Sequence, residues 1–161
     1  MLHTRGHADR AHDMTGHRLT EFLDELGATR TAGTDRWQLD GSTWRATVTV
    51  TPGRWLGLEF AAHDPVTGRR ATYDIDTDLY DISQEKHRWF AEEIERDIVE
   101  FLGNLRSGVV LRGNDGPKFV LVFPSEGGWV RVVQGRFLTK ASTHADVESA
   151  RLGDGPYVPI D

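Results

Sequence analysis

The stretch WRATVTVTPGRWLGLEFAAH, residues 44–63, decides the fold, because apolar residues return at every second position on both sides of a Pro-Gly turn. This alternation is typical of β-strands, whose successive side chains point to opposite faces of a sheet. A three-residue loop, 52–54, places the valines of the first strand beside Leu56 and Leu58 of the second on one face. A two-residue loop would put them beside acidic side chains. We therefore predict an antiparallel hairpin with the longer loop and one buried face.

Similar alternation lies on both sides of this hairpin, in residues 35–40 (DRWQLD) and 70–79 (RATYDIDTDL). Asp40-Gly41 and the DPVTG segment, residues 64–68, connect these strands to the hairpin and carry residues typical of tight turns. Short connections make neighbouring strands antiparallel. The sequence therefore predicts an antiparallel β-meander of about four strands.

Helical spacing appears before and after the meander. A short first helix is predicted to end at Gly27, and its apolar residues are Leu19, Phe22, Leu23 and Leu26. A long amphipathic helix follows the meander, with Asp81 or Ser83 as its cap. Its apolar stripe runs at spacings of three and four residues through Phe90, Ile94, Ile98, Phe101 and Leu105. Such a stripe predicts that the helix packs on a sheet.

The C-terminal part adds three strand candidates, residues 108–113, 117–125 and 128–135. The middle one is apolar on both faces, which favours a central position, and residues 143–152 favour a helical turn or two. This order predicts an α+β fold, with the meander followed by the long helix and a further three-stranded meander. We expect residues 18–161 to form a single domain and residues 1–17 to be a disordered, histidine-containing N-terminal tail.

Composition excludes several classes of function. The 161-residue chain has no cysteine, which excludes disulfides, thiol catalysis and cysteine-ligated metals. Its net charge of −6 repels phosphate backbones, and its basic residues form only loose groups, such as Arg131, Arg136 and Lys140, so we expect no nucleic-acid partner. The sequence has neither a long apolar run nor a secretory signal pattern, which predicts a cytoplasmic protein with no membrane partner.

The acidic stretch YDIDTDLYDISQE, residues 73–85, has the ligand spacing of a calcium-binding loop when it is read from Asp74. Leu79 occupies the position where a calcium-binding loop needs glycine. The segment before the acidic stretch is also a predicted strand, whereas a helix precedes a calcium-binding loop. The alternation predicts that Tyr73, Ile75, Thr77 and Leu79 face the core. Glu85 is better explained as an acid in the first turn of a helix, where the helix dipole favours it.

A candidate binding surface follows from the expected pairing of the strands. If Asp64 lies opposite Arg69, then Leu56 lies opposite Thr77, and the acidic side chains share the outer face of the sheet. Glu59 and Asp74 then face each other as like charges, which is unfavourable unless a cation or a basic partner offsets it. The predicted partner-binding residues are Trp55, Glu59, Asp74, Asp76 and Asp78.

These residues suggest a non-enzymatic, acidic protein-binding module, for instance an inhibitor or immunity-type protein that neutralises a basic partner. The alternative is a divalent-metal-binding domain or a metal-dependent hydrolase that uses the carboxylates of Glu59, Asp74, Asp76 and Asp78. An ordinary solvated sheet face is the third interpretation. The sequence contains no recognisable catalytic motif, so we assign no catalytic residue, metal ligand or cofactor, and the oligomeric state stays open.

Overall fold

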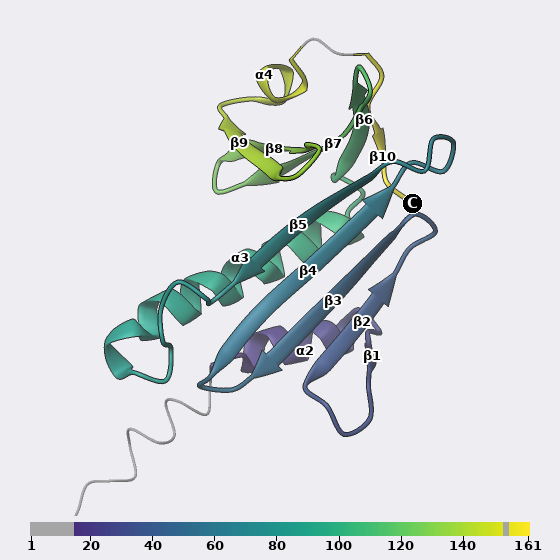
Figure 1. Ribbon diagram of the computed structural model, residues 1–161. Coiled ribbons are helices and arrows are strands. Elements are labelled where there is room, and N and C mark those ends of the chain that lie inside the picture. The colour runs from purple at the N-terminus through teal and green to yellow at the C-terminus, as the bar shows by residue number, and fades with distance from the viewer. Residues whose placement is uncertain (1–14, 153–154) are drawn as a thin grey trace, which may run out of the picture. The chain divides into compact units, whose positions relative to one another are not determined.

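The computed structural model describes residues 15–152 and 155–161, and Figure 1 shows its elements. Helix α2 comprises His17–Glu25. The first sheet has the strand order β1-β2-β3-β4-β5. Its strands are Thr29–Arg30, Arg36–Asp40, Trp44–Thr51, Trp55–His63 and Arg70–Asp76. A 3₁₀ turn, η1, at Glu85–His87 leads into helix α3, Arg88–Arg106.

The second sheet has the strand order β10-β6-β7-β8-β9 and is antiparallel. Its strands β6 to β9 are Leu111–Asp115, Lys118–Ser125, Gly128–Gln134 and Thr139–His144. Helix α4, Val147–Arg151, and strand β10, Val158–Pro159, complete the chain. Strand β7 is central and its residues 119–123 are buried, as the run of apolar residues predicts.

The predicted α+β class, with antiparallel sheets and one long helix, is confirmed, but the predicted count of four plus three strands is wrong. The described residues form two five-stranded sheets. The missed strands are β1 and β10, which have two residues each, and β9, whose sequence TKASTH shows no apolar alternation. Edge strands of this kind bury too little surface to leave a hydrophobic pattern in the sequence.

The chain divides into two compact units. Of the described residues, unit 1 contains 15–39, 47–58 and 75–99, and unit 2 contains 40–46, 59–74, 100–152 and 155–161. The expected single domain over residues 18–161 stays a prediction. Of the expected N-terminal tail, residues 1–14 lie outside the described residues, whereas Thr15 is buried and α2 begins at His17.

The predicted pairing within the meander is confirmed by backbone hydrogen bonds. The Thr77 N–H donates to the Leu56 carbonyl at 3.0 Å, and the Asp64 N–H donates to the Arg69 carbonyl at 2.7 Å. These two bonds belong to one continuous register, the one expected from the DPVTG turn. The His63 N–H donates to the Thr43 carbonyl at 2.9 Å, as a three-residue loop after Thr51 requires.

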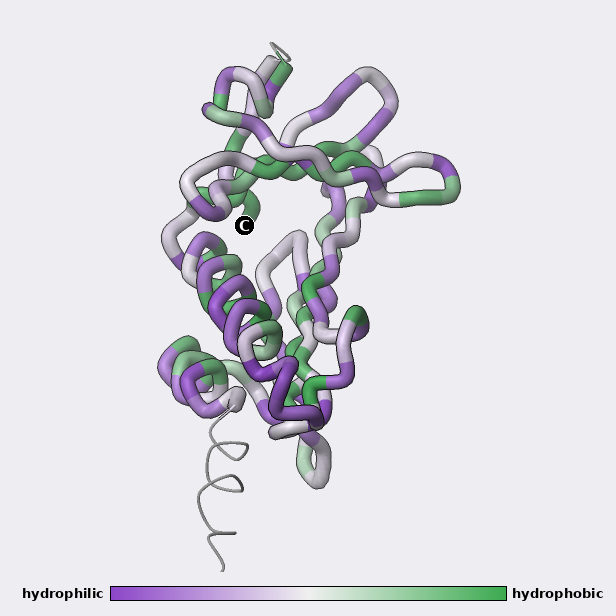
Figure 2. Tube along the Cα trace, turned by 90° about the vertical axis from the view of Figure 1, so that its left-hand side faces the viewer, coloured by the Kyte–Doolittle hydropathy of each residue, from purple (hydrophilic) through white to green (hydrophobic). Residues whose placement is uncertain are grey.

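Helix α3 carries the predicted apolar stripe. Its side chains Phe90, Ile94, Ile98 and Phe101 are buried, and Leu105 is half-buried. Figure 2 shows the α3 coil alternating between hydrophobic and hydrophilic residues. The helix begins at Arg88, after the 3₁₀ turn, and not directly after the predicted cap at Asp81 or Ser83.

Unit 1 places a carboxylate beside the start of α2. Gly16 has φ 91° and no side chain caps the helix from its own N-cap. A Cβ at Gly16 would lie 2.6 Å from Val50 Cγ1, so the close approach requires glycine. The Glu95 carboxylate, from α3, accepts a hydrogen bond from the Leu19 N–H at 3.5 Å. Burial raises the pKa of Glu95 above its ordinary value, and the Leu19 and Gly16 N–H groups lower it only in part.

We expect Glu95→Gln to be more stable than the wild type at pH 7, because glutamine keeps an acceptor for the Leu19 N–H without a buried charge. A raised folded-state pKa means that protonation stabilises the fold below about pH 4.5, and that this stability is lost as the pH rises through the folded-state pKa. In urea unfolding, the difference in the free energy of unfolding between the variant and the wild type should therefore increase from pH 4 to pH 7. Parallel stability curves for the two proteins would contradict this interpretation of Glu95.

Candidate functional site

Three of the predicted site residues meet in unit 1. The Trp55 indole Nε1–H donates to Asp78 Oδ1 at 2.6 Å, and the Asp78 N–H donates to Asp76 Oδ1 at 2.9 Å. The Trp55 ring also lies over Gly57, where an added Cβ would come within 2.0 Å of a ring carbon. Trp55 is therefore half-buried and held in place, and it does not present its whole ring as a free anchor.

The other two predicted site residues, Glu59 and Asp74, belong to unit 2. Both are exposed, and the register of the hairpin places them opposite each other. Both residues also take part in further interactions, so neither is without a partner. Their assignment to a partner-binding surface stays a prediction.

The segment after β5 differs from the sequence-based expectation. The strand ends at Asp76, and Leu79, expected in the core, is 74% exposed. Residues 77–84, here the connecting loop, lead to the 3₁₀ turn before α3. The strand ends early because the Thr77 hydroxyl turns back to the preceding strand. Thr77 Oγ1 accepts from the Leu56 N–H at 3.0 Å and donates to the Leu56 carbonyl at 3.3 Å.

Asp81 holds the second half of the connecting loop in shape. Its Oδ1 accepts from the Ser83 hydroxyl at 2.6 Å and from the Ser83 N–H at 3.0 Å, and its Oδ2 accepts from Gln84 Nε2 at 3.2 Å. The hydrogen bonds from the Ser83 side chain are the largest cause that lowers the pKa of Asp81 below its ordinary value. Ile82 is buried next to this turn. The loop is thus fixed at Thr77 and at Ile82, and the residues between these points face outward.

An aromatic patch, here Leu79, Tyr80 and Trp89, lies on and beside this loop. The Tyr80 ring lies 5.6 Å from the Trp89 ring and 4.9 Å from the rings of His87 and Phe90. Trp89 is 54% exposed and Tyr80 is 39% exposed, although both are large apolar side chains. Sequence reasoning missed the patch because Trp89 lies outside the apolar stripe of α3 and alternation placed Leu79 in the core.

The geometry of Asp76 and Asp78 does not resemble a calcium loop. One oxygen of each carboxylate accepts an N–H donor, from Asp78 and Trp55 respectively. Asp76 ends an extended strand, whereas a calcium loop curls so that its oxygens converge on one point. The alternative metal site on Glu59, Asp74, Asp76 and Asp78 gains no support from these contacts. What the arrangement offers is negative charge beside exposed aromatic rings.

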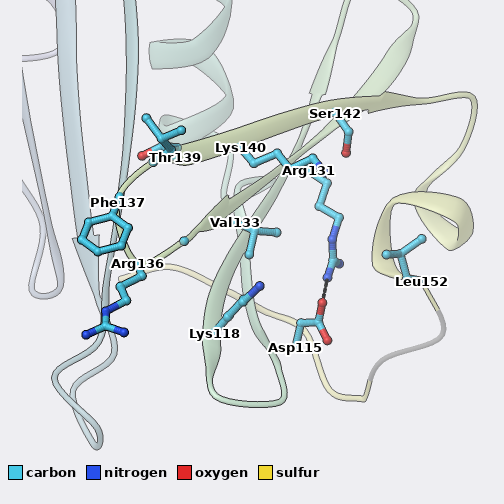
Figure 3. A pocket seen from close by; sticks show the side chains of 12 residues that line it. Asp115, Lys118, Arg131, Val133, Arg136, Phe137, Thr139, Lys140, Ser142 and Leu152 are labelled. Atoms are coloured by element: carbon cyan, nitrogen blue, oxygen red, sulfur yellow. Dashed lines mark hydrogen bonds and ion pairs between the residues drawn. The ribbon is translucent and has the colours of Figure 1, made fainter.

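Unit 2 contains a second feature, an open groove of about 670 Å³ on the second sheet, shown in Figure 3. Its lining residues are Asp115, Lys118, Arg131, Val133, Gly135, Arg136, Phe137, Leu138, Thr139, Lys140, Ser142 and Leu152. Arg131 is 3% exposed and forms an ion pair with Asp115 at 2.9 Å, drawn as the dashed line in Figure 3. The groove therefore combines apolar and basic side chains in an acidic protein.

The sequence contained one signal for this groove. Arg131, Arg136 and Lys140 stood out as a loose basic group, but they were spread over a segment whose pairing was unknown. Strand β9 brings them together, because Lys140 pairs with Val133 and Ser142 with Arg131 across the β8–β9 hairpin. Lys118 joins them from β7, the neighbouring strand of β8.

In comparisons with known proteins, no family model, no curated protein and no solved structure matches this chain. Among the helices that the structure describes, none is long and apolar enough to cross a membrane. A functional assignment therefore depends on the chemistry of the two surfaces themselves.

Proposed function

We propose that this protein is a non-enzymatic binding module that holds a basic protein partner on the aromatic patch and the acidic side chains beside it. The observation that carries the proposal is the exposure of Leu79, Tyr80 and Trp89 next to Asp78 and Asp81. Large exposed apolar groups with a polar surround are typical of interaction sites. A few residues supply most of the binding energy at such sites, tryptophan and tyrosine are enriched among them, and the charges select the partner.

The order of the connecting loop also supports binding. A loop that is already fixed at Thr77 and by the hydrogen bonds of Asp81 loses little conformational freedom when a partner docks. The Tyr80 ring is likewise held by contacts with Trp89 and Phe90. A preformed aromatic surface of this kind suits a partner whose Lys or Arg side chains reach the carboxylates, as an inhibitor or immunity-type protein would require.

The test removes the aromatic contribution and the charge contribution to partner binding in separate variants. Trp89→Ala removes the most exposed aromatic ring, and Asp76→Asn/Asp78→Asn removes two charges while the amide oxygens still accept the N–H donors. Matched controls are Phe137→Ala, an exposed ring in unit 2, and Asp24→Asn/Glu25→Gln, two exposed charges on α2. Each protein is used to capture partners from cells that encode it, and the captured protein is then purified and titrated by calorimetry.

We expect one basic protein to be captured by the wild type and by both controls. Trp89→Ala should raise its dissociation constant by about 30-fold, which corresponds to about 2 kcal/mol for a hot-spot residue. The charge variant should weaken binding most at low salt. The same captured proteins and affinities for all five proteins would contradict the proposal, and so would capture of an acidic partner.

A further inference from the structure

One face of the second sheet is covered over only part of its area. On this face Val120 and Val122 are fully buried under Ala150 of α4, and the Tyr157 ring lies over Gly113, where an added Cβ would come within 2.6 Å of it. This half of the face is an ordinary apolar core. Helix α4 has only five residues, so it ends before it reaches the β8–β9 turn of the same face.

The uncovered half of this face carries a valine with one lysine on each side of it. Val133 pairs with Val120 on one side and with Lys140 on the other. Lys118 precedes Val120 by two residues, so its side chain emerges on the same face. In Figure 3 Lys118 extends from its hairpin toward Val133, in the middle of the groove. The groove thus has an apolar residue, Val133, on its floor, and lysines on the two neighbouring strands line it on either side.

Arg131 contributes structure to the groove, not a free charge. Its guanidinium donates to the Ala150 carbonyl at 3.0 Å, to the Tyr157 hydroxyl at 2.9 Å and to Asp115 Oδ2 at 2.9 Å. Asp115 balances its charge. Among the residues that the structure describes, no carboxylate forms an ion pair with Lys118, Arg136 or Lys140. Within the described part of the chain, three cationic side chains therefore remain at the groove, although the net charge of the chain is −6.

The ends of the groove are apolar and exposed. Phe137 lies at one end, at the β8–β9 turn, and Leu152 lies at the other, after α4 (Figure 3). Leu138, the residue after Phe137, also lines the groove. Phe137 is 85% exposed and Leu138 is 78% exposed. The Arg136 guanidinium lies 5.4 Å from the centre of the Phe137 ring. A groove of about 670 Å³ has the size of small-molecule sites in proteins.

We propose that this groove binds a small organic anion that has an apolar body. Its carboxylate, phosphate or sulfonate lies between the ammonium groups of Lys118 and Lys140, and its apolar part lies on Val133 and reaches Phe137 and Leu138. An apolar ligand alone would leave the lysines without a partner, and a simple inorganic anion would leave the apolar floor in water. This site lies wholly in unit 2 and does not depend on the proposed protein partner.

The chain contains three lysines, which makes the site directly observable. Reductive methylation with ¹³C-labelled formaldehyde keeps the charge of each lysine and places methyl groups that NMR detects on Lys86, Lys118 and Lys140, as well as on the N-terminal amine. The probes are decanoate and anilinonaphthalene sulfonate, with octanol as the neutral probe and inorganic phosphate as the anion without an apolar body. We expect both anionic amphiphiles to shift the signals of Lys118 and Lys140 and to leave that of Lys86 in place.

The affinity is measured by calorimetry on the unmodified protein. Lys118→Gln/Lys140→Gln should raise the dissociation constant for decanoate by about tenfold, whereas the matched variants Lys86→Gln and Trp89→Ala should leave it unchanged. Vesicles of phosphatidylglycerol and an acidic peptide are tested in parallel. Equal shifts of all three lysine signals would overturn the proposal. It would equally be overturned by phosphate binding as tightly as decanoate, or by binding to vesicles or peptide alone.

Discussion

Arg131→Met should lower the free energy of unfolding by about 3 to 4 kcal/mol. The Arg131 side chain is 3% exposed, and among the described residues it donates to the Ala150 carbonyl on α4, to the Tyr157 hydroxyl and to Asp115 on β6. Methionine fills much of the volume but removes the donor of the buried Ala150 carbonyl and of the part-buried Tyr157 hydroxyl. Asp115 is half-exposed, so its charge returns to water at little cost. The loss of stability therefore comes mainly from the buried Ala150 carbonyl, which loses its donor.

The measurement is urea unfolding of the wild type and the variant, with Arg136→Met as the control. Arg136 is exposed and lies at the β8–β9 turn of the same sheet, so its replacement should change the free energy of unfolding by no more than about 0.5 kcal/mol. A similar loss for both variants would show that the network around Arg131 does not hold α4 on the sheet.

Phe101→Ala should lower the free energy of unfolding by about 4 kcal/mol. In unit 2 the Phe101 ring lies 5.0 Å from the rings of both Phe60 and Phe123 and 5.6 Å from that of Tyr73. These contacts come from both sheets and α3, so alanine leaves a cavity that no single element closes by moving. Edge-to-face contacts between the rings add to the loss of buried area.

Phe137→Ala is the matched control, because the same change at an 85% exposed ring removes almost no buried contact. Its free energy of unfolding should stay within about 0.5 kcal/mol of the wild type in the same urea experiment. If Phe101→Ala were as mild as this control, the aromatic cluster would not be the centre of the unit 2 core.

The sequence predicted the elements whose pattern is local. Alternation and turn residues were enough for the central hairpins, because Pro52-Gly53 and the DPVTG turn fix the register that hydrogen bonds confirm. The apolar stripe was enough for α3. Strand β9 was missed because an exposed edge strand carries no hydrophobic pattern, and the groove was missed with it.

The candidate sites depend on contacts that no local pattern contains. The alternation of apolar and polar residues continues through Leu79 in the sequence. The strand nevertheless ends earlier, because the Thr77 hydroxyl forms hydrogen bonds with the backbone of Leu56 in the neighbouring strand. Trp55 was correctly placed off the core face, but its ring folds over Gly57, which leaves room because it has no side chain. The surface predicted around Trp55 did not include Tyr80 on the connecting loop or Trp89 on α3, although both side chains are exposed.

The most direct test of the proposed binding function is the association and dissociation rates of the purified basic partner, measured over a range of salt concentrations. Asp76→Asn/Asp78→Asn should slow association and weaken its salt dependence, because these charges steer the encounter. Trp89→Ala should leave association nearly unchanged and speed dissociation by about 30-fold, because the ring anchors the complex. Rates that both variants share with the wild type at every salt concentration would contradict a partner site on the aromatic patch.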